Sequence, residues 1–257
     1  MTRAITLLLG IDESEYGHIA LESQHEGRTA CALSVGSDAL SPSRLHKARH
    51  DVPNEDAALA IDDGPLTLLA VADAHYGHEA SHEVLRQIAE LADPIPDNPL
   101  EALELLRRIE TLEPTPSETT LALAILDHDR GQVHGYAFGD SSVLVLDPER
   151  PPRLLNPHNV RYLRPDQPDS MDPRLAQEFQ ARLAPGSLLL AYTDGIDACH
   201  YDHPESSITL AHIHELQQAH GTPAAFLEAL TSLALAGISP HPGGQDNIAA
   251  VCTNMIS

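Results

Sequence analysis

Four short acidic segments of the sequence are candidates for a reactive site, because each places a carboxylate at the end of an apolar run of strand length. A single acid at a strand end is ordinary turn chemistry, since Asp and Asn accept local backbone hydrogen bonds there. Packed sheets, however, bring strand ends to a common edge, where four clustered carboxylates repel one another unless a cation neutralises them. Ligands that are all oxygen favour Mg²⁺ or Mn²⁺ over zinc. The four segments are Asn54-Glu55-Asp56 before AALAI, Asp73-Ala74-His75 after LLAVA, Asp194-Gly195 after LLLAYT, and Asp246-Asn247 before IAAVC.

The segments around these acids are predicted to alternate between strands and pairs of helices. Apolar residues at helical spacing predict helices at 79–92, 98–112 and 207–219, and Thr222-Pro223 predicts the start of a fourth. This order predicts sheets sandwiched between helical layers, in one domain over residues 1–257. Residues 147–186 are rich in Pro, Asp and Arg, and we expect a flap insertion with a short helical piece around 173–183. Apolar runs predict strands at 4–9, 30–35, 66–72, 119–126, 133–138, 142–146, 187–193 and 248–253.

The composition limits the partners of the chain. Fifteen Lys and Arg against 38 Asp and Glu give the 257 residues a formal net charge of −23. This charge repels phosphate backbones at long range, which argues against a nucleic-acid partner. Three cysteines without a CxxC pair indicate a reducing compartment, and the apolar stretch from Ala4 to Ile11 is too short to span a bilayer. We therefore expect a cytoplasmic monomer with no membrane partner.

The order and spacing of these segments resemble the PP2C-like (PPM) metal-dependent protein phosphatases over roughly residues 28–254. The resemblance implies an α+β fold, an α/β sandwich in which two packed antiparallel β-sheets are flanked by helices on both sides. It also implies metal-dependent hydrolysis of phosphoserine or phosphothreonine in a phosphorylated protein substrate. The matching segments are NEDA (54–57), VADAHYG (71–77), SETTLALAIL (117–126), AFGDSSVLVL (137–146), LLLAYTDGIDA (188–198) and GGQDNIAAV (243–251).

The same resemblance implies a binuclear centre that holds two Mn²⁺ or Mg²⁺ ions. By this resemblance Asp73 bridges both ions, and the main-chain carbonyl of Ala74 holds one of them. Asp194 and Asp246 ligate the other ion, and Glu55 ligates directly or through water. Two such ions lower the pKa of a water molecule for in-line attack and offset the charge on the phosphoryl oxygens.

Four further residues take roles from the resemblance. Asp56 belongs to the metal site and orients the water that the ions bind, and Asn247 supports the ligands without contacting the ions itself. His75 matches a histidine proposed as general acid to the leaving oxygen in some members of the family. Asp140 matches a residue that supports the turn beneath the site.

The sequence departs from the family pattern at the rim of this site. Ala74 replaces the first glycine after Asp73, and its carbonyl stays available as a ligand if φ is negative there. Tyr76 replaces the next glycine, and Glu118 replaces the glycine of the S-G-T-T segment. Thr115 falls about where some members carry an aspartate for a third ion, so we expect two ions rather than three.

The phosphate-binding arginine of the family pattern is also missing, because Asp51 stands in its place. If the chain before Pro53 is extended, Arg49 shares a face with Asp51, since side chains alternate along a strand. A planar guanidinium suits a bidentate phosphate contact. We therefore expect Arg49 to be the phosphate clamp, with Arg44 or an arginine of the flap as lesser candidates.

Two other functions stay open. One is a SpoIIE/RsbU-like regulatory phosphatase of the same fold, which the YTDG segment and the acidic residues after it favour and NEDA argues against. The other is a catalytically dead pseudophosphatase that acts as a binding module, which the missing arginine supports and the intact acids oppose. A serine hydrolase or a P-loop protein is not indicated, because the sequence has no G-x-S-x-G or Walker A segment.

Sixteen histidines raise the question of a zinc site. His212 and His214 are two residues apart, which places them on different faces of a helix. Cys199, His200 and His203 fall close together in a predicted loop. For both groups we expect solvated polar positions rather than metal ligands.

Overall fold

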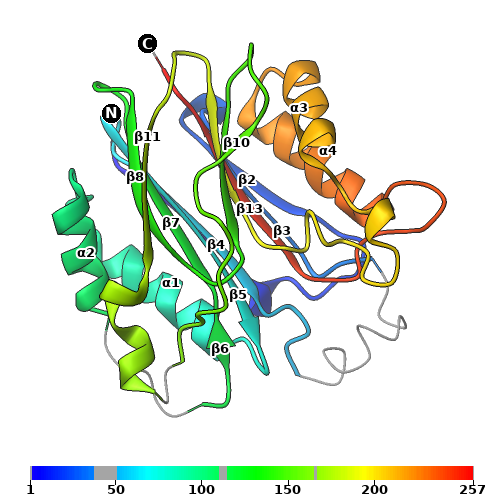
Figure 1. The fold of residues 1–257 in the computed structure, drawn as a ribbon, viewed down its shortest axis with the longest axis horizontal. Coiled ribbons are helices and arrows are strands. Elements are labelled where there is room, and N and C mark those ends of the chain that lie inside the picture. Colours follow the sequence, from blue (N-terminus) through cyan, green and yellow to red (C-terminus); the bar gives the residue numbers. More distant parts are fainter. Residues whose placement is uncertain (1, 38–50, 110–114, 165–166, 257) are drawn as a thin grey trace.

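The computed structural model describes residues 2–37, 51–109, 115–164 and 167–256, in which two antiparallel sheets pack face to face (Figure 1). The first sheet has the spatial order β1 (Ala4–Leu9), β4 (Asp56–Asp62), β5 (Leu66–His75), β7 (Leu121–Asp127), β8 (Gln132–Phe138) and β11 (Gln177–Arg182), with β6 (Glu118–Thr119) paired to β5. The second has the order β10 (Arg153–Leu154), β9 (Ser142–Leu146), β12 (Leu188–Tyr192), β13 (Ile248–Asn254), β3 (Thr29–Ser34) and β2 (Ala20–Gln24).

Helices cover both outer faces of this pair of sheets (Figure 1). The first sheet is covered by α1 (Glu79–Leu91) and α2 (Pro99–Arg107), and the second by α3 (Leu210–Ala219) and α4 (Pro223–Ala236). The side chain of Asn98 caps α2 by accepting hydrogen bonds from the backbone N–H groups of Leu100 and Glu101, and the side chain of Thr222 caps α4. Short 3₁₀ turns lie at Gly10–Asp12, His25–Gly27, Pro168–Met171, Pro173–Leu175 and Pro204–Ser206.

The apolar core forms three layers, one between the sheets and one under each pair of helices. β4 shows how the layers follow from the two-residue period of a strand. Leu59 and Ile61 belong to the layer under α1 and α2, whereas Ala58 and Ala60 belong to the layer between the sheets. All four side chains are fully buried, which makes β4 a strand without a solvent-facing side.

The predicted fold class is confirmed, since two packed antiparallel sheets carry helices on both outer faces. The short helix expected around 173–183 is wrong. Apart from the 3₁₀ turn at its start, this stretch forms β11, which pairs with β8 at the edge of the first sheet. Phe179 is buried there while the polar residues on either side of it are exposed, which is the alternation of an edge strand. None of the helices in the described ranges is long and apolar enough to cross a bilayer.

Candidate metal centre

Four strands bring the acidic segments to one edge of the sandwich. β4 begins at Asp56 and β5 carries Asp73 near its end, and the strand register places these two residues directly opposite each other. On the second sheet, β12 ends two residues before Asp194 and its neighbour β13 begins two residues after Asp246. We call Glu55, Asp56, Asp73, Asp194 and Asp246 the acidic edge.

A hydroxyl group joins the two sheets at this edge. Thr193, the residue before Asp194, donates its Oγ1–H to Oδ2 of Asp56 across 2.7 Å. The same Oγ1 accepts a hydrogen bond of 2.9 Å from the backbone N–H of Ala249 in β13. Thr193 is fully buried, so its side chain has one position and holds the Asp56 carboxylate in one orientation.

Asn247 makes a second cross-link between the sheets. Its Oδ1 accepts from the backbone N–H of Glu55 at 3.1 Å, and its Nδ2 donates to the carbonyls of Val35 and Pro53, also at 3.1 Å. Gly195 packs so closely against this residue that a Cβ there would lie 1.9 Å from the Asn247 carbonyl oxygen. The segments of Asp194 and Asp246 are therefore in direct contact, and Asn247 holds the backbone of Glu55 beside them.

The turn after β5 wraps around Glu55. The backbone N–H of Gly77 donates to Glu55 Oε1 across 2.7 Å, and Ser117 Oγ donates to the Gly77 carbonyl across 2.6 Å. The left-handed conformation of this turn falls on Tyr76, with φ of 66°, and not on Ala74. Ala74 continues β5 in extended conformation, which satisfies the condition on φ for its carbonyl to serve as a ligand.

A buried histidine lies beneath Asp56. His82, on the inner face of α1, accepts at Nε2 from the backbone N–H of Gly10 across 3.0 Å, and the same nitrogen lies 3.3 Å from the Asp56 carbonyl oxygen. Burial, with a smaller contribution from the neighbouring His78, lowers the pKa of His82 from 6.5 to about 3. His82 is therefore neutral at physiological pH and braces the start of β4.

Tyr162 faces the acidic edge from the 147–186 stretch. Its hydroxyl donates to Asp140 Oδ2 at 3.2 Å. Burial and the negative charge of Asp140, followed by the charges of Asp194 and Asp73, raise the pKa of Tyr162 above its ordinary value. Asp140 thus lies beside the acidic edge, and its carboxylate faces Tyr162. Sequence reasoning missed Tyr162, and no local signal marks it, because the tyrosine lies outside every acidic segment.

His75 lies at the rim of the acidic edge, with its side chain 35% exposed. Its Nδ1 is 4.0 Å from Glu118 Oε1, and Glu118 in turn pairs through Oε2 with Nε of Arg164 at 2.5 Å. The ring of Tyr162 meets the ring of His75 edge-on, with 5.3 Å between centroids. Glu118, which stands where the family pattern has glycine, therefore places a carboxylate beside the imidazole.

The acidic edge fits hard divalent cations. Four of its five carboxylates are at most 6% exposed, and Asp194 is of intermediate exposure. Carboxylates that are buried close together disfavour each other's ionised form, and divalent cations bound among them offset this repulsion. The oxygen-only donor set matches Mg²⁺ or Mn²⁺ better than zinc.

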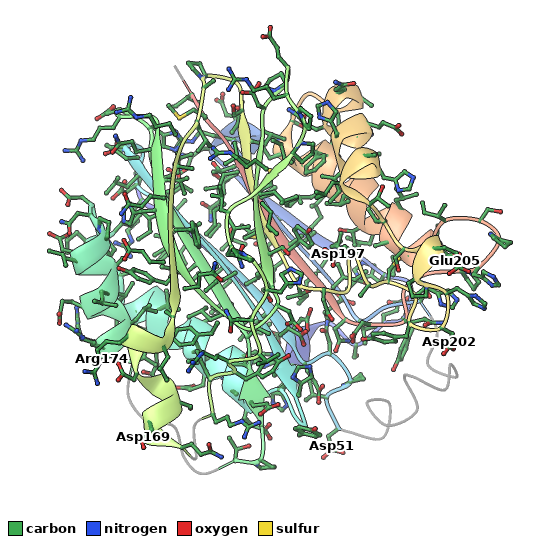
Figure 2. The ribbon with its side chains drawn as sticks, viewed as in Figure 1. Asp51, Asp169, Arg174, Asp197, Asp202 and Glu205 are labelled. Atoms are coloured by element: carbon green, nitrogen blue, oxygen red, sulfur yellow. The ribbon has the colours of Figure 1, made fainter. Side chains whose placement is uncertain are left out.

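The arginine predicted to hold the phosphate is not placed by the structure, because Arg49 and Arg44 lie outside the described residues. Asp51 is described and exposed, and it lies at the bottom of Figure 2, at the end of the molecule where β4 begins. Among the arginines of the 147–186 stretch, Arg164 reaches the rim through Glu118, whereas Arg174 pairs locally with Asp172.

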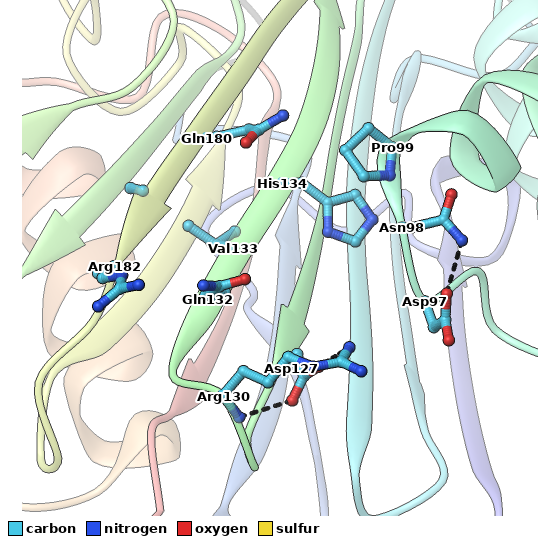
Figure 3. A pocket seen from close by; sticks show the side chains of 11 residues that line it. Asp97, Asn98, Pro99, Asp127, Arg130, Gln132, Val133, His134, Gln180 and Arg182 are labelled. Carbon is cyan, nitrogen blue, oxygen red and sulfur yellow. Dashed lines mark hydrogen bonds and ion pairs between the residues drawn. The ribbon is translucent and has the colours of Figure 1, made fainter.

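A separate pocket of about 420 Å³ lies at the opposite end of the first sheet (Figure 3). The start of α2 and the turn between β7 and β8 form its walls, and it is lined by Asp97, His134 and an Asp127–Arg130 ion pair. Asp127 stands opposite Leu66, the first residue of β5, so the length of this strand separates the pocket from Asp73. The pocket contributes nothing to the acidic edge.

Comparisons with known proteins match the chain to one family and to one fold. The family model of stage II sporulation protein E (SpoIIE) matches residues 63–255. The catalytic domain of the serine/threonine protein phosphatase PstP, solved with two manganese ions, is similar at 18% identity with a TM-score of 0.65 over 93% of this chain and 100% of that one. RsbX in complex with magnesium is similar at 13% identity with a TM-score of 0.60, over 93% of this chain and 100% of that one. A bacterial serine phosphatase is similar at 16% identity with a TM-score of 0.64, over 88% of this chain and 97% of that one.

The solved structures show the fold, and the family model shows the family. No protein of curated function matches the chain. The predicted PP2C-like resemblance is confirmed, and the family that matches is the SpoIIE group that the sequence analysis held as an alternative within the same fold. The family model covers most of the sequence, including three of the four acidic segments. The chain therefore belongs to the SpoIIE family, in the PPM (PP2C-type) class of serine/threonine phosphatases.

Proposed function

We propose that this protein hydrolyses phosphoserine or phosphothreonine in a protein substrate, with Mn²⁺ or Mg²⁺ as cofactor. The observation that carries the proposal is the acidic edge, where Asp56 and Asp73 are directly opposite each other. Thr193 and Asn247 tie this pair to the segments of the second sheet. A site held by buried contacts from four strands is rigid, and rigid placement of charged groups is what phosphoryl transfer requires.

Two divalent cations bound at this edge would supply an activated water and offset negative charge on the phosphoryl group. Their ligands in this proposal are Glu55, Asp56, Asp73, the carbonyl of Ala74, Asp194 and Asp246. Asn247 fixes the backbone on which Glu55 stands.

Two side chains of the chain handle protons and water in this proposal. Asp56, held at Oδ2 by Thr193, orients the attacking water. His75 donates a proton to the leaving oxygen of the serine or threonine, and its place at the exposed rim suits contact with a substrate from solvent. The Glu118 carboxylate lies between His75 and Arg164, so Glu118 and Arg164 position the imidazole.

The 147–186 stretch is proposed to act as a flap that contacts the substrate. Leu163 and Thr119 exchange two backbone hydrogen bonds of 2.8 and 2.9 Å, which fix this segment beside β6 and the acidic edge. Tyr162 then points inward to Asp140, while Arg161 and Val160 are exposed. An exposed arginine on a segment beside the site suits contact with a phosphorylated peptide segment of a protein.

We propose that the enzyme acts as a monomer.

Arg49 is proposed as the phosphate clamp, on the sequence argument alone. Arg49→Ala should raise KM several-fold and lower kcat/KM, because a lost phosphate contact weakens substrate binding, while Mn²⁺ affinity stays unchanged. Steady-state kinetics together with calorimetric Mn²⁺ titration measures both. Wild-type kinetics in this variant would assign the phosphate contact to another positively charged side chain.

The function itself is tested by hydrolysis of 4-nitrophenyl phosphate and of phosphothreonine peptides with Mn²⁺, with Mg²⁺ and with chelator. Asp73→Asn should lower kcat/KM by about 100-fold or more, since it removes a charge that the cations need. Asp129→Asn, the same change on an exposed residue at the other end of the sheet, should keep wild-type activity. Absence of turnover in the wild type at every metal concentration would favour the pseudophosphatase.

A further inference from the structure

Three side chains away from the acidic edge form a group with the chemistry of a metal site. The ligand atoms of His203, Glu205 and His241 all lie within 4.8 Å of one another. We call these three residues the histidine cluster. His203 and Glu205 come from the loop after β12, and His241 comes from the loop between α4 and β13. Figure 2 shows Glu205 at the right-hand edge of the molecule, on the same loop as Asp202.

The local geometry brings three imidazole rings together. The rings of His203 and His241 are parallel, with centroids 3.5 Å apart and 3° between their planes. His203 Nδ1 lies 3.1 Å from Glu205 Oε1. His200 is buried and meets both stacked rings edge-on, at 5.0 and 5.4 Å, while its Nδ1 accepts from the backbone N–H of His203. The stack therefore places two imidazole rings, whose nitrogens are a ligand type of zinc, beside one carboxylate.

The donor set differs from that of the acidic edge. Two imidazole nitrogens and one carboxylate are the ligands of a three-residue zinc site with an open fourth position, and imidazole favours Zn²⁺ over Mg²⁺ or Mn²⁺. Bonds of about 2.0–2.2 Å to one ion require the ligand atoms to move closer than their present spread. The stacked rings must also turn, because a metal lies in the plane of each imidazole that binds it. His203 and His241 are only partly buried and Glu205 is exposed, which leaves them free to make this adjustment.

The cluster lies on loops that also carry ligands of the acidic edge. Tyr201 donates its backbone N–H to Gln245 Oε1 across 2.8 Å, and the Gln245 N–H donates to the Cys199 carbonyl across 3.1 Å. Gln245 directly precedes Asp246, and Cys199 lies five residues after Asp194. We propose that the histidine cluster binds Zn²⁺, or a similar borderline transition-metal ion, and thereby clamps together the two loops that carry Asp194 and Asp246.

Cys199 takes no part in this site. It is fully buried, and its sulfur is not among the ligand atoms that lie within 4.8 Å of one another. The sequence grouped His203 with Cys199 and His200. In the structure His200 packs against the His203 ring, but the ligand atoms that gather with that of His203 belong to Glu205 and to His241 from a distant loop.

Calorimetric titration of Zn²⁺ into the full-length protein in excess Mg²⁺ tests the proposal, because Mg²⁺ competes for the acidic edge and binds imidazole poorly. The wild type should bind one Zn²⁺ per chain at the cluster. His203→Ala and His241→Ala should each weaken this binding at least about tenfold. His214→Ala, a matched change of a partly buried histidine on α3, should leave it unaltered, and Asp73→Asn should also retain it.

A second readout follows the clamp itself. Zn²⁺ should slow hydrogen exchange at the backbone amides of Tyr201 and Gln245 in the wild type, and should not slow it in His241→Ala. Equal Zn²⁺ affinity in the wild type and both cluster variants would overturn the proposal, as would Zn²⁺ binding that disappears only in Asp73→Asn. The measurements concern Zn²⁺ binding alone, so either result leaves the proposed phosphatase activity unaffected.

Discussion

The acidic edge is built around two strand residues, with its other carboxylates within two residues of a strand end, whereas the histidine cluster stands on loops. At the acidic edge, Asp56 and Asp73 face each other across two central strands, and buried contacts from Thr193 and Asn247 fix their surroundings. In the histidine cluster, the three side chains are exposed or only partly buried, and they are joined to one another by a ring stack and a polar contact of 3.1 Å.

This difference shows how the supporting element selects the kind of site. Strand ends give a fixed, oxygen-only edge, which suits hard cations and a reaction that depends on exact placement of charge. Loops give imidazoles that can turn, which suits an ion that binds tightly to few ligands and draws them together. The two sites are adjacent in the chain, since Gln245 contacts the loop of the cluster and directly precedes Asp246.

The largest expected effect concerns stability. Mn²⁺ at about 100 times its Kd should raise the unfolding free energy by about 2.7 kcal/mol, or about 5–10 °C in Tm for a chain of this size, because it relieves repulsion in the folded state alone. Asp246→Asn should lose most of this shift, and His203→Ala should keep it. Thermal unfolding with and without Mn²⁺ measures both, and equal shifts in the two variants would erase the distinction between the sites.

The next effect concerns the buried histidine of the acidic edge. His82 has a pKa of about 3 in the folded protein and about 6.5 when unfolded. The unfolded chain therefore binds more protons between these values, and stability falls as pH decreases through this window. From pH 7 to pH 5 the loss due to His82 should be about 2 kcal/mol.

Urea unfolding in chelator at both pH values measures this loss. His82→Asn should lose correspondingly less stability than the wild type between pH 7 and pH 5, because the titrating group is gone. His214→Ala, on the surface helix α3, should follow the wild type. The same pH dependence in His82→Asn and the wild type would show that the histidine is not held neutral beneath Asp56.

The smallest effect tests whether the hydroxyl between the sheets matters for the reaction. Thr193→Val keeps the shape but removes the hydrogen bond to Asp56 Oδ2, and should lower Mn²⁺-dependent kcat/KM about tenfold or more. Thr193→Ser keeps the hydroxyl and should retain most activity. Because valine also leaves the Ala249 N–H without its acceptor, Tm of both variants is needed beside the kinetics. Equal kinetics in the two variants would remove Thr193 from the positioning of Asp56.

The acidic segments could be found from the sequence because their signal is local. A carboxylate next to a buried apolar run is visible within ten residues, and the order of these segments carried the resemblance to the phosphatase class. The helix start at Thr222-Pro223 was equally local, and the Thr222 cap is present. The edge strand β11 was mistaken for a helix because its single buried apolar side chain, Phe179, gives too weak a period.

Contacts between distant segments were decided by the tertiary structure alone. Tyr162 meets Asp140, Arg164 reaches Glu118, and His241 stacks on His203, and in each case the path of a loop makes the contact. No period or spacing encodes such a path, since a loop is held by packing and hydrogen bonds to elements elsewhere in the chain. Local patterns predicted the strands at 66–72, 187–193 and 248–253 and the carboxylates next to them. The fold decided which side chains from distant loops stand beside them, because only packing brings residues far apart in sequence within reach of each other.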